Sequence, residues 1–120
     1  MHTPKGTHFL LEIKTITNAY LNDVEAIRSI LIGAAEASKA TIIESFFHQF
    51  EPYGVSGVVV IAESHLTIHT WPEHNYLAVD IFTCGKLIDP GAAVGYLCLV
   101  LEIESIEVRN LSRGLPFSLK

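Results

Sequence analysis

The chain has 120 residues, of which 49% are apolar and 18% charged, enough apolar material for one domain with a core of its own. Thirteen acidic residues against eight basic ones give a formal net charge of −5, which argues against a protein that binds the phosphate backbone of nucleic acids. No apolar run has the length of a membrane span, and no secretory signal opens the chain. The two cysteines do not make a disulfide scaffold, so we expect a cytoplasmic protein. From the charge and the absence of a long apolar run, we expect neither a nucleic-acid nor a membrane partner.

The first half of the chain predicts a strand, a helix and a second strand. Residues 7–14 form an apolar-rich run of strand length. From Asp23 to about Lys39, apolar residues recur at spacings of three and four, which indicates an amphipathic helix. Residues 40–50 are rich in β-branched and aromatic side chains and predict a strand, which Pro52 and the residues after it interrupt.

The second half begins with the most strand-like stretch of the protein. The apolar run from Gly57 continues to Trp71 and predicts one strand that is buried on both faces. A turn follows at residues 72–75. The remaining elements are a strand at 76–83, a helix at about 91–101 that Asp89 caps, and a strand at 103–111.

The predicted order is therefore strand, helix, three strands, helix, strand. This order favours an α+β fold, a two-layer sandwich in which two helices cover one face of a mainly antiparallel sheet. The other face of the sheet is available to a second subunit.

Reactive side chains gather on the predicted hairpin and its approach. They are Ser56, Glu63, Ser64, His65, His69, Glu73 and Cys84. If the hairpin turns around residues 72–75, Ser64 faces Thr83 and Glu63 faces Cys84, and cross-strand neighbours lie roughly 5 Å apart at Cβ. The thiol of Cys84 should then lie near the peptide bond between Glu63 and Ser64.

His69 is badly placed to act on Ser64 of the same chain. Five residues of extended strand separate the two by about 16 Å, and because five is odd their side chains point to opposite faces. Either the strand breaks near Ser64, or a symmetry mate supplies His69. A twofold dimer would supply it in both sites.

Two other kinds of site use the same residues. A zinc site is disfavoured because His65 and His69 lie about 13 Å apart on an extended strand, and the HExxH pattern is absent. A hydrolase triad of Ser64, His69 and either Asp80 or Glu73 has the right residue types but lacks the GxSxG turn. Structural roles are also open for these side chains. A structural role is the better prediction for Trp71, which we expect to be a packing residue, and for Cys98, which we expect in the core.

A specific resemblance is carried by residues 53–73, YGVSGVVVIAESHLTIHTWPE, and by residues 82–85, FTCG. Both stretches closely resemble the small prokaryotic S-adenosylmethionine decarboxylases. The likeness extends from about Gly6 to Gly114 and so covers most of the chain. That family consists of zymogens that cleave themselves and carry a pyruvoyl cofactor.

The resemblance implies autocatalytic cleavage between Glu63 and Ser64, giving chains of residues 1–63 and 64–120. Ser64 would become the pyruvoyl group, with Ser56 and His69 assisting the cleavage. The group would form a Schiff base with the substrate amine, and Cys84 would return a proton to the substrate as a general acid. Neither pyridoxal phosphate nor a metal is expected.

The resemblance also implies how the substrate binds. Phe50 corresponds to the residue that stacks on adenine, and Glu73 to the acid that holds the ribose hydroxyls. The family's sites lie between two protomers of a homodimer, with the pyruvoyl group and the thiol from one protomer and the binding residues from the other. The implied product is decarboxylated S-adenosylmethionine, the aminopropyl donor of spermidine synthesis.

Two positions near the start depart from the family. Lys5 and Thr7 stand where an apolar residue and an arginine are usual. Some members of the family decarboxylate arginine or ornithine, so the same chemistry on a free amino acid remains an alternative. A catalytically silent dimer partner is another.

Overall fold

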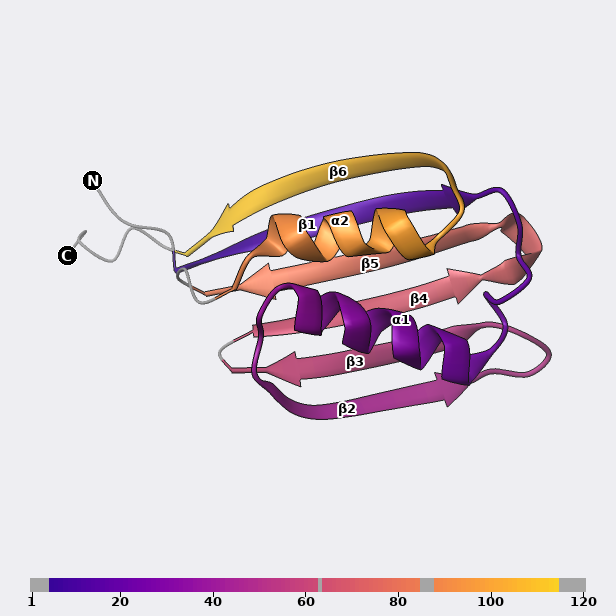
Figure 1. The fold of residues 1–120 in the computed structure, drawn as a ribbon, viewed down its shortest axis with the longest axis horizontal. Coiled ribbons are helices and arrows are strands. Elements are labelled where there is room, and N and C mark those ends of the chain that lie inside the picture. Colours follow the sequence, from indigo (N-terminus) through magenta and orange to yellow (C-terminus); the bar gives the residue numbers. More distant parts are fainter. Residues whose placement is uncertain (1–4, 63, 85–87, 115–120) are drawn as a thin grey trace.

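The computed structural model describes residues 5–62, 64–84 and 88–114, and Figure 1 shows their fold. Within these residues, six strands and two helices follow one another with a short 3-10 turn. They are β1 (Gly6–Thr15), α1 (Val24–Ala37), β2 (Ile42–Gln49), β3 (Val55–Ile61), β4 (Ser64–Trp71), η1 (Pro72–His74), β5 (Tyr76–Thr83), α2 (Pro90–Val100) and β6 (Ile103–Arg113).

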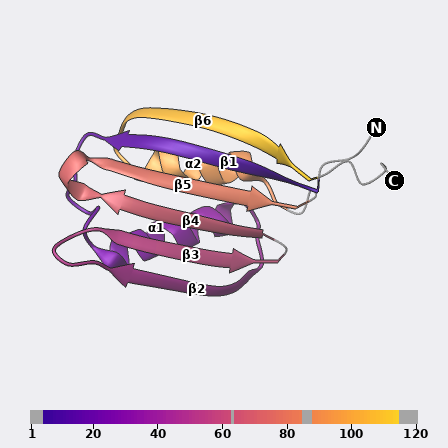
Figure 2. The same cartoon turned by 180° about the vertical axis from the view of Figure 1, so that it is seen from behind.

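The strands form one sheet in the order β2-β3-β4-β5-β1-β6, and every neighbouring pair is antiparallel. Both helices lie on the same face of this sheet, as the views from the two sides show (Figures 1 and 2). The predicted α+β sandwich with its helices on one face is confirmed. None of the described helices is long and apolar enough to cross a membrane.

The prediction of a single strand from Gly57 to Trp71 is wrong. The chain turns at Ala62, and Ile61 of β3 pairs with Ser64 of β4, so four strands rather than three lie between the helices. The sequence hides this turn because no glycine or proline marks it, and an apolar run looks the same in one strand or in two. Nor is β3 buried on both faces: Val59 and Ile61 are buried, whereas Val60 is exposed.

The register of the next hairpin is the predicted one. His65 pairs with Phe82 and Thr67 with Asp80, which is the pairing expected for a turn at residues 72–75. The turn η1 closes with Asn75 in the left-handed conformation, at φ 52°. The start of β4 therefore lies beside the end of β5.

The core lies between the sheet and the helices, and alternate residues of the central strands point into it. Both helices begin at an aspartate whose side chain accepts backbone N–H groups, Asp23 for α1 and Asp89 for α2. Fully buried members from the sheet and the helices include Leu11, Ile13, Leu66, Ile68, Leu77, Val79, Ile81, Ile27, Leu31 and Leu97.

The opposite face of the sheet carries no helix, and we call it the open face (Figure 2). Three phenylalanines divide between the two faces: Phe47 is buried, whereas Phe46 is 65% exposed and Phe50 45%. Cross-strand pairing places many side chains on the open face, among them His8, Glu12, Phe46, His48, Ser56, Val58, Val60, His65, Thr67, His69, Trp71, Tyr76, Asp80 and Phe82.

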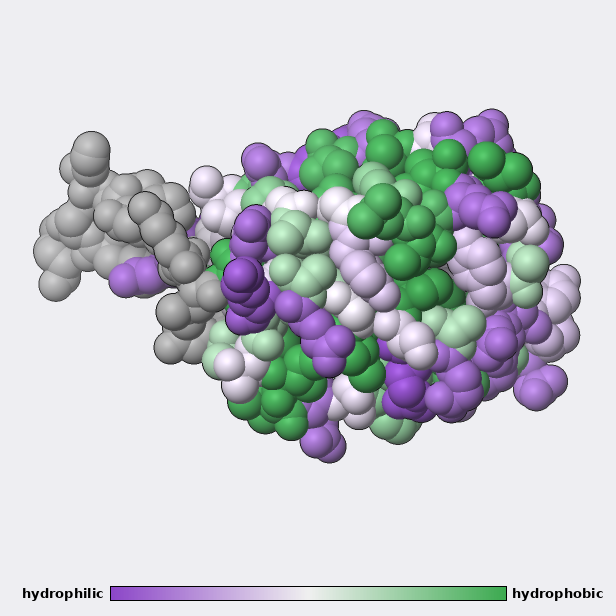
Figure 3. Space-filling model, viewed as in Figure 1, coloured by the Kyte–Doolittle hydropathy of each residue, from purple (hydrophilic) through white to green (hydrophobic). Residues whose placement is uncertain are grey.

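Apolar side chains also gather around α2 on the helical side of the molecule (Figure 3). Leu99 is 86% exposed there, and Cys98 is exposed beside it. The expectation that Cys98 lies in the core is wrong. Its helix is apolar on every side, so spacing alone could not tell which side faces the sheet.

Candidate active site

Ser64 and Cys84 lie together, as the hairpin register predicted. Ser64 is the first residue of β4, and Cys84 directly follows β5. The backbone N–H of Cys84 donates to Ser64 Oγ over 3.2 Å. Glu63, the other residue of the expected cleavage bond, lies outside the described residues. The Ser64 hydroxyl, a potential nucleophile, and Cys84, which carries a thiol, therefore lie at the same end of the β4–β5 hairpin.

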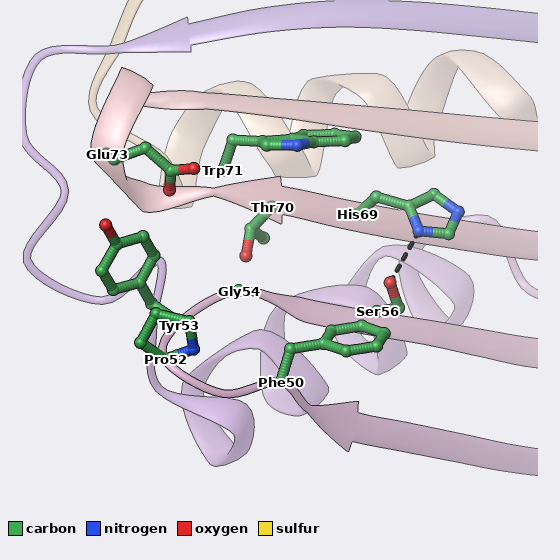
Figure 4. Close-up of a pocket in the computed structure, with 9 residues that line it drawn as sticks. All are labelled: Phe50, Pro52, Tyr53, Gly54, Ser56, His69, Thr70, Trp71 and Glu73. Atoms are coloured by element: carbon green, nitrogen blue, oxygen red, sulfur yellow. Dashed lines mark hydrogen bonds between the residues drawn. The ribbon is translucent and has the colours of Figure 1, made fainter.

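Ser56 and His69 form a second pair on the open face. They are direct cross-strand partners of β3 and β4, and a hydrogen bond of 2.7 Å joins Ser56 Oγ to His69 Nδ1 (Figure 4). The strand is unbroken from Ser64 to Trp71, so five residues of extended chain, about 16 Å, separate His69 from Ser64. His69 and Ser64 of one chain therefore do not meet.

A pocket of about 400 Å³ lies where β4 runs into η1. Four of the predicted site residues line it: Phe50, Ser56, His69 and Glu73. Figure 4 shows Glu73 on the side of the turn, and Phe50, Ser56 and His69 further along the strands. The structure thus divides the predicted residues into two groups, with Ser64 and Cys84 at the opposite end of β4.

Tyr53 and Trp71 also line this pocket, and the sequence did not single out either as a site residue. Trp71, expected to be a packing residue, is 39% exposed, and its ring lies 5.2 Å from that of Tyr76 between centroids. A signal for Trp71 was available, since it has the same parity as His69 along one strand. Tyr53 lies in the loop between β2 and β3, whose course the sequence pattern does not predict.

An apolar groove of about 330 Å³ adjoins the pocket. Phe50, Ser56 and His69 line both hollows, and Phe46 and Val58 line the groove alone. His48 meets the ring of Phe50 edge-on, with centroids 4.6 Å apart. The phenylalanine ring is therefore fixed from one side and open on the other.

Among the residues that the structure describes, Tyr76 has a pKa clearly above its ordinary value of 10. Its hydroxyl donates to Glu12 Oε1 on the neighbouring strand β1. This hydrogen bond, with burial and the negative charges of Glu12 and Asp80, raises the pKa of Tyr76 to about 12. Within residues 5–62, 64–84 and 88–114, no three acidic, histidine or cysteine side chains gather closely enough to hold a metal ion.

A family model, S-adenosylmethionine decarboxylase, matches residues 7–114. The chain belongs to the S-adenosylmethionine decarboxylase family. Relatives called S-adenosylmethionine decarboxylase proenzyme include one from Thermodesulfovibrio yellowstonii, 49% identical over 92% of this chain and 82% of its own length. Another, from Thermosipho melanesiensis, is 50% identical over 91% of this chain and 84% of its own length.

Solved structures of the family have the same fold. The adenosylmethionine decarboxylase of Aquifex aeolicus superposes with a TM-score of 0.84 at 36% identity, over 95% of this chain and 94% of that one. The Trypanosoma brucei AdoMetDC monomer matches with a TM-score of 0.60 over 90% of this chain and 46% of its own, but at 17% identity it shows the fold alone. The family expected from residues 53–73 is thus confirmed.

Proposed function

We propose that the chain is a decarboxylase of S-adenosylmethionine that makes its own pyruvoyl group from Ser64. The observation that carries the proposal is the contact between Ser64 Oγ and the backbone N–H of Cys84 at the head of β4. It brings a serine that directly follows a turn and a thiol-bearing residue together in a chain of this family. The product would be decarboxylated S-adenosylmethionine, an aminopropyl donor for spermidine synthesis in the cytoplasm.

Self-cleavage would begin at the hydroxyl of Ser64. Its oxygen attacks the carbonyl carbon of Glu63, so an ester replaces the peptide bond. Loss of the Cα proton of Ser64 expels the Glu63 carboxylate, and hydrolysis of the remaining dehydroalanine releases ammonia. The products are chains of residues 1–63 and 64–120. The N–H of Cys84 supports the first step because it fixes the attacking oxygen.

The residues present fit a pyruvoyl group at this position, because Ser64 opens β4 and its Oγ accepts the backbone N–H of Cys84, whose thiol belongs to the same end of the hairpin. When formed, the group supplies a carbonyl that accepts the electrons left behind when CO2 departs. The Cys84 thiol then donates a proton to the α-carbon of the substrate as a general acid. Neither pyridoxal phosphate nor a metal has a role in this scheme.

The pocket around Phe50 is the proposed nucleoside site. The exposed ring of Phe50 offers a face on which adenine can stack, and the carboxylate of Glu73 can accept hydrogen bonds from both ribose hydroxyls. Ser56 and His69, joined by their hydrogen bond, would move protons during self-cleavage.

A homodimer with shared sites would unite the two groups of residues. Within one chain His69 is about 16 Å along β4 from Ser64, so a second copy must bring its pocket to this Ser64. The open face supports this arrangement because it exposes Phe46, Phe50 and Trp71, which a facing sheet would bury.

Intact mass spectrometry of the purified protein tests the proposal. We expect two chains that correspond to residues 1–63 and 64–120, the latter with a carbonyl that borohydride reduces. Ser64→Ala should remain a single chain of 13.2 kDa. A wild-type protein that stays uncleaved while it releases CO2 would contradict the proposal.

The substrate is tested by CO2 release from S-adenosylmethionine, arginine and ornithine. Lys5 and Thr7, which depart from the family, favour the two free amino acids as the alternative. CO2 release from S-adenosylmethionine alone supports the proposal. Release from arginine or ornithine alone would show that the chain decarboxylates a free amino acid by the same chemistry. A folded, uncleaved and inactive protein would identify a silent dimer partner.

A further inference from the structure

The loop of residues 50–54, which carries one wall of the proposed nucleoside site, is held by the side chains of Asn22 and Gln49. Asn22 Oδ1 accepts the backbone N–H of Gly54 over 2.7 Å and Gln49 Nε2 over 2.8 Å. Gln49 Nε2 also lies 3.1 Å from the carbonyl oxygen of Gly54. These three residues form a closed network beneath Phe50 and Tyr53.

Asn22 belongs to the segment between β1 and α1, and this segment also holds the opposite wall of the pocket, at the turn η1. Asn18 Nδ2 donates to the carbonyl oxygen of Pro72, next to Glu73, over 3.1 Å. Between the two asparagines, the backbone carbonyl of Leu21 accepts the hydroxyl of the buried Thr70 over 2.8 Å. The spacing between the two walls is therefore fixed by residues 18–22.

Gly54 is the point at which this network sets the course of the loop. Its φ of +112° is a conformation that other residues rarely adopt, and a β-carbon there would lie 3.3 Å from the carbonyl oxygen of Thr70. The carbonyl of Gly54 accepts the N–H of Phe50 over 2.8 Å. Asn22 thus holds the N–H of Gly54, while the carbonyl of the same glycine holds the N–H of Phe50, so Gly54 links Asn22 to the start of the loop.

Asn22 faces a hollow rather than the core. A second pocket of about 300 Å³ adjoins the nucleoside pocket and is lined by Asn18, Asn22, Tyr53, Pro72 and Glu73. Tyr53 and Glu73 line both pockets. A change at Asn22 therefore removes hydrogen bonds to the loop without opening a cavity in the core.

We propose that Asn22, acting with Gln49, is a positioning residue for the binding of the nucleoside part of the substrate. It fixes the loop so that Phe50 and Tyr53 stand at the right distance from Glu73. The inference rests on the proposed function of the pocket. It goes further in that it assigns a role in affinity to a residue outside the pocket around Phe50.

Steady-state kinetics of Asn22→Ala provide the first test. We expect KM for S-adenosylmethionine to rise about three- to tenfold, the factor that one net hydrogen bond is typically worth, with kcat and self-cleavage nearly unchanged. Asn22→Asp should stay close to the wild type, because a carboxylate oxygen accepts the same two hydrogen bonds. Asn110→Ala, at an exposed position of β6, is the matched control.

Fluorescence of Trp71 gives a second readout that needs no turnover. Trp71 is the single tryptophan of the chain and lines the pocket, so titration with 5′-methylthioadenosine reports binding of the nucleoside directly. The Kd should rise by the same factor in Asn22→Ala and in Gln49→Ala. The double variant should cost no more than either single one, because both side chains act through one network.

The outcomes separate this inference from the proposed function. Phe50→Ala should raise KM whether or not Asn22 matters. If Phe50→Ala leaves KM unchanged, the assignment of the pocket fails and this inference fails with it. If Phe50→Ala raises KM while Asn22→Ala lowers only the melting temperature, Asn22 is merely structural and this inference alone is overturned.

Discussion

The contact between Cys84 and Ser64 uses the backbone of one residue and the side chain of the other. The donor to Ser64 Oγ is the N–H of Cys84, which any substitution except proline retains. The thiol itself is left for the substrate. The two proposed steps, self-cleavage and decarboxylation, can therefore be separated at this residue.

We predict that Cys84→Ser still cleaves into two chains but decarboxylates about 10²- to 10⁴-fold more slowly, the usual contribution of a general acid. A hydroxyl is a far weaker acid than a thiol, so the α-carbon of the substrate is reprotonated slowly. Gel electrophoresis measures the cleavage and CO2 release the turnover. Loss of cleavage together with turnover would place the thiol in the first step.

Tyr76 provides a residue whose pKa can be followed by the absorbance of its phenolate. The hydrogen bond to Glu12 raises its pKa from 10 to about 12, so the folded protein favours the protonated phenol. The resulting stabilisation is complete below pH 10 and is lost as the pH rises from about 10 to about 12.

We expect Glu12→Gln to lower this pKa toward 10, because it weakens the hydrogen bond that holds the phenol proton and removes the charge that opposes ionisation. The chain has four tyrosines, so the titration curve of Tyr76→Phe is subtracted to isolate Tyr76. An unchanged curve in Glu12→Gln would show that the carboxylate is not the cause.

At the scale of elements, the ring of Phe47 on β2 lies directly over Gly57 on β3, which has no side chain. A β-carbon at Gly57 would lie 2.1 Å from the ring of Phe47, its cross-strand partner. This close approach lets Phe47 lie buried against the sheet.

We predict that Gly57→Ala lowers the free energy of unfolding by about 1–3 kcal/mol, the usual cost of overpacking a core. Gly95→Ala is the matched control, since a β-carbon there meets nothing within 4 Å. In the middle of α2 alanine should instead stabilise by up to about 1 kcal/mol. Urea denaturation measures both, and equal signs would refute the steric argument.

At the scale of the whole molecule, the open face and the division of the site make a joint prediction. Cys84→Ala and Phe50→Ala damage opposite ends of the sheet. In a dimer with shared sites, a mixed dimer combines both defects in one site and leaves the other intact. Random pairing then restores about a quarter of wild-type activity.

Co-expression of the two variants, followed by assay of the purified mixture, measures this restoration. Each variant alone serves as the control and should have low activity when the substrate concentration is kept below the KM of the wild type. Activity no greater than the mean of the two variants would show that each site belongs to one chain.

The hairpin of β4 and β5 shows how much the sequence can determine. Alternating side chains and a turn at Pro72 defined the register, and with it the contact between Ser64 and Cys84. The turn between β3 and β4 was missed because the apolar residues on its two sides obey one pattern. The pairing of Ile61 with Ser64 across this turn is seen in the folded chain and has no counterpart in the sequence pattern.

The α+β class and the family could be predicted from the sequence, and candidate residues could be named, because these depend on local period and on a motif of contiguous residues. Which candidates share a pocket, and that Asn22 holds its wall, became visible in the folded chain. These contacts join segments far apart in the chain, such as Asn22 and Gly54, which no short pattern links. The exposure of Phe46 and Cys98 could not be predicted for a related reason. Hydrophobicity alone does not say which side of a strand or helix faces the core.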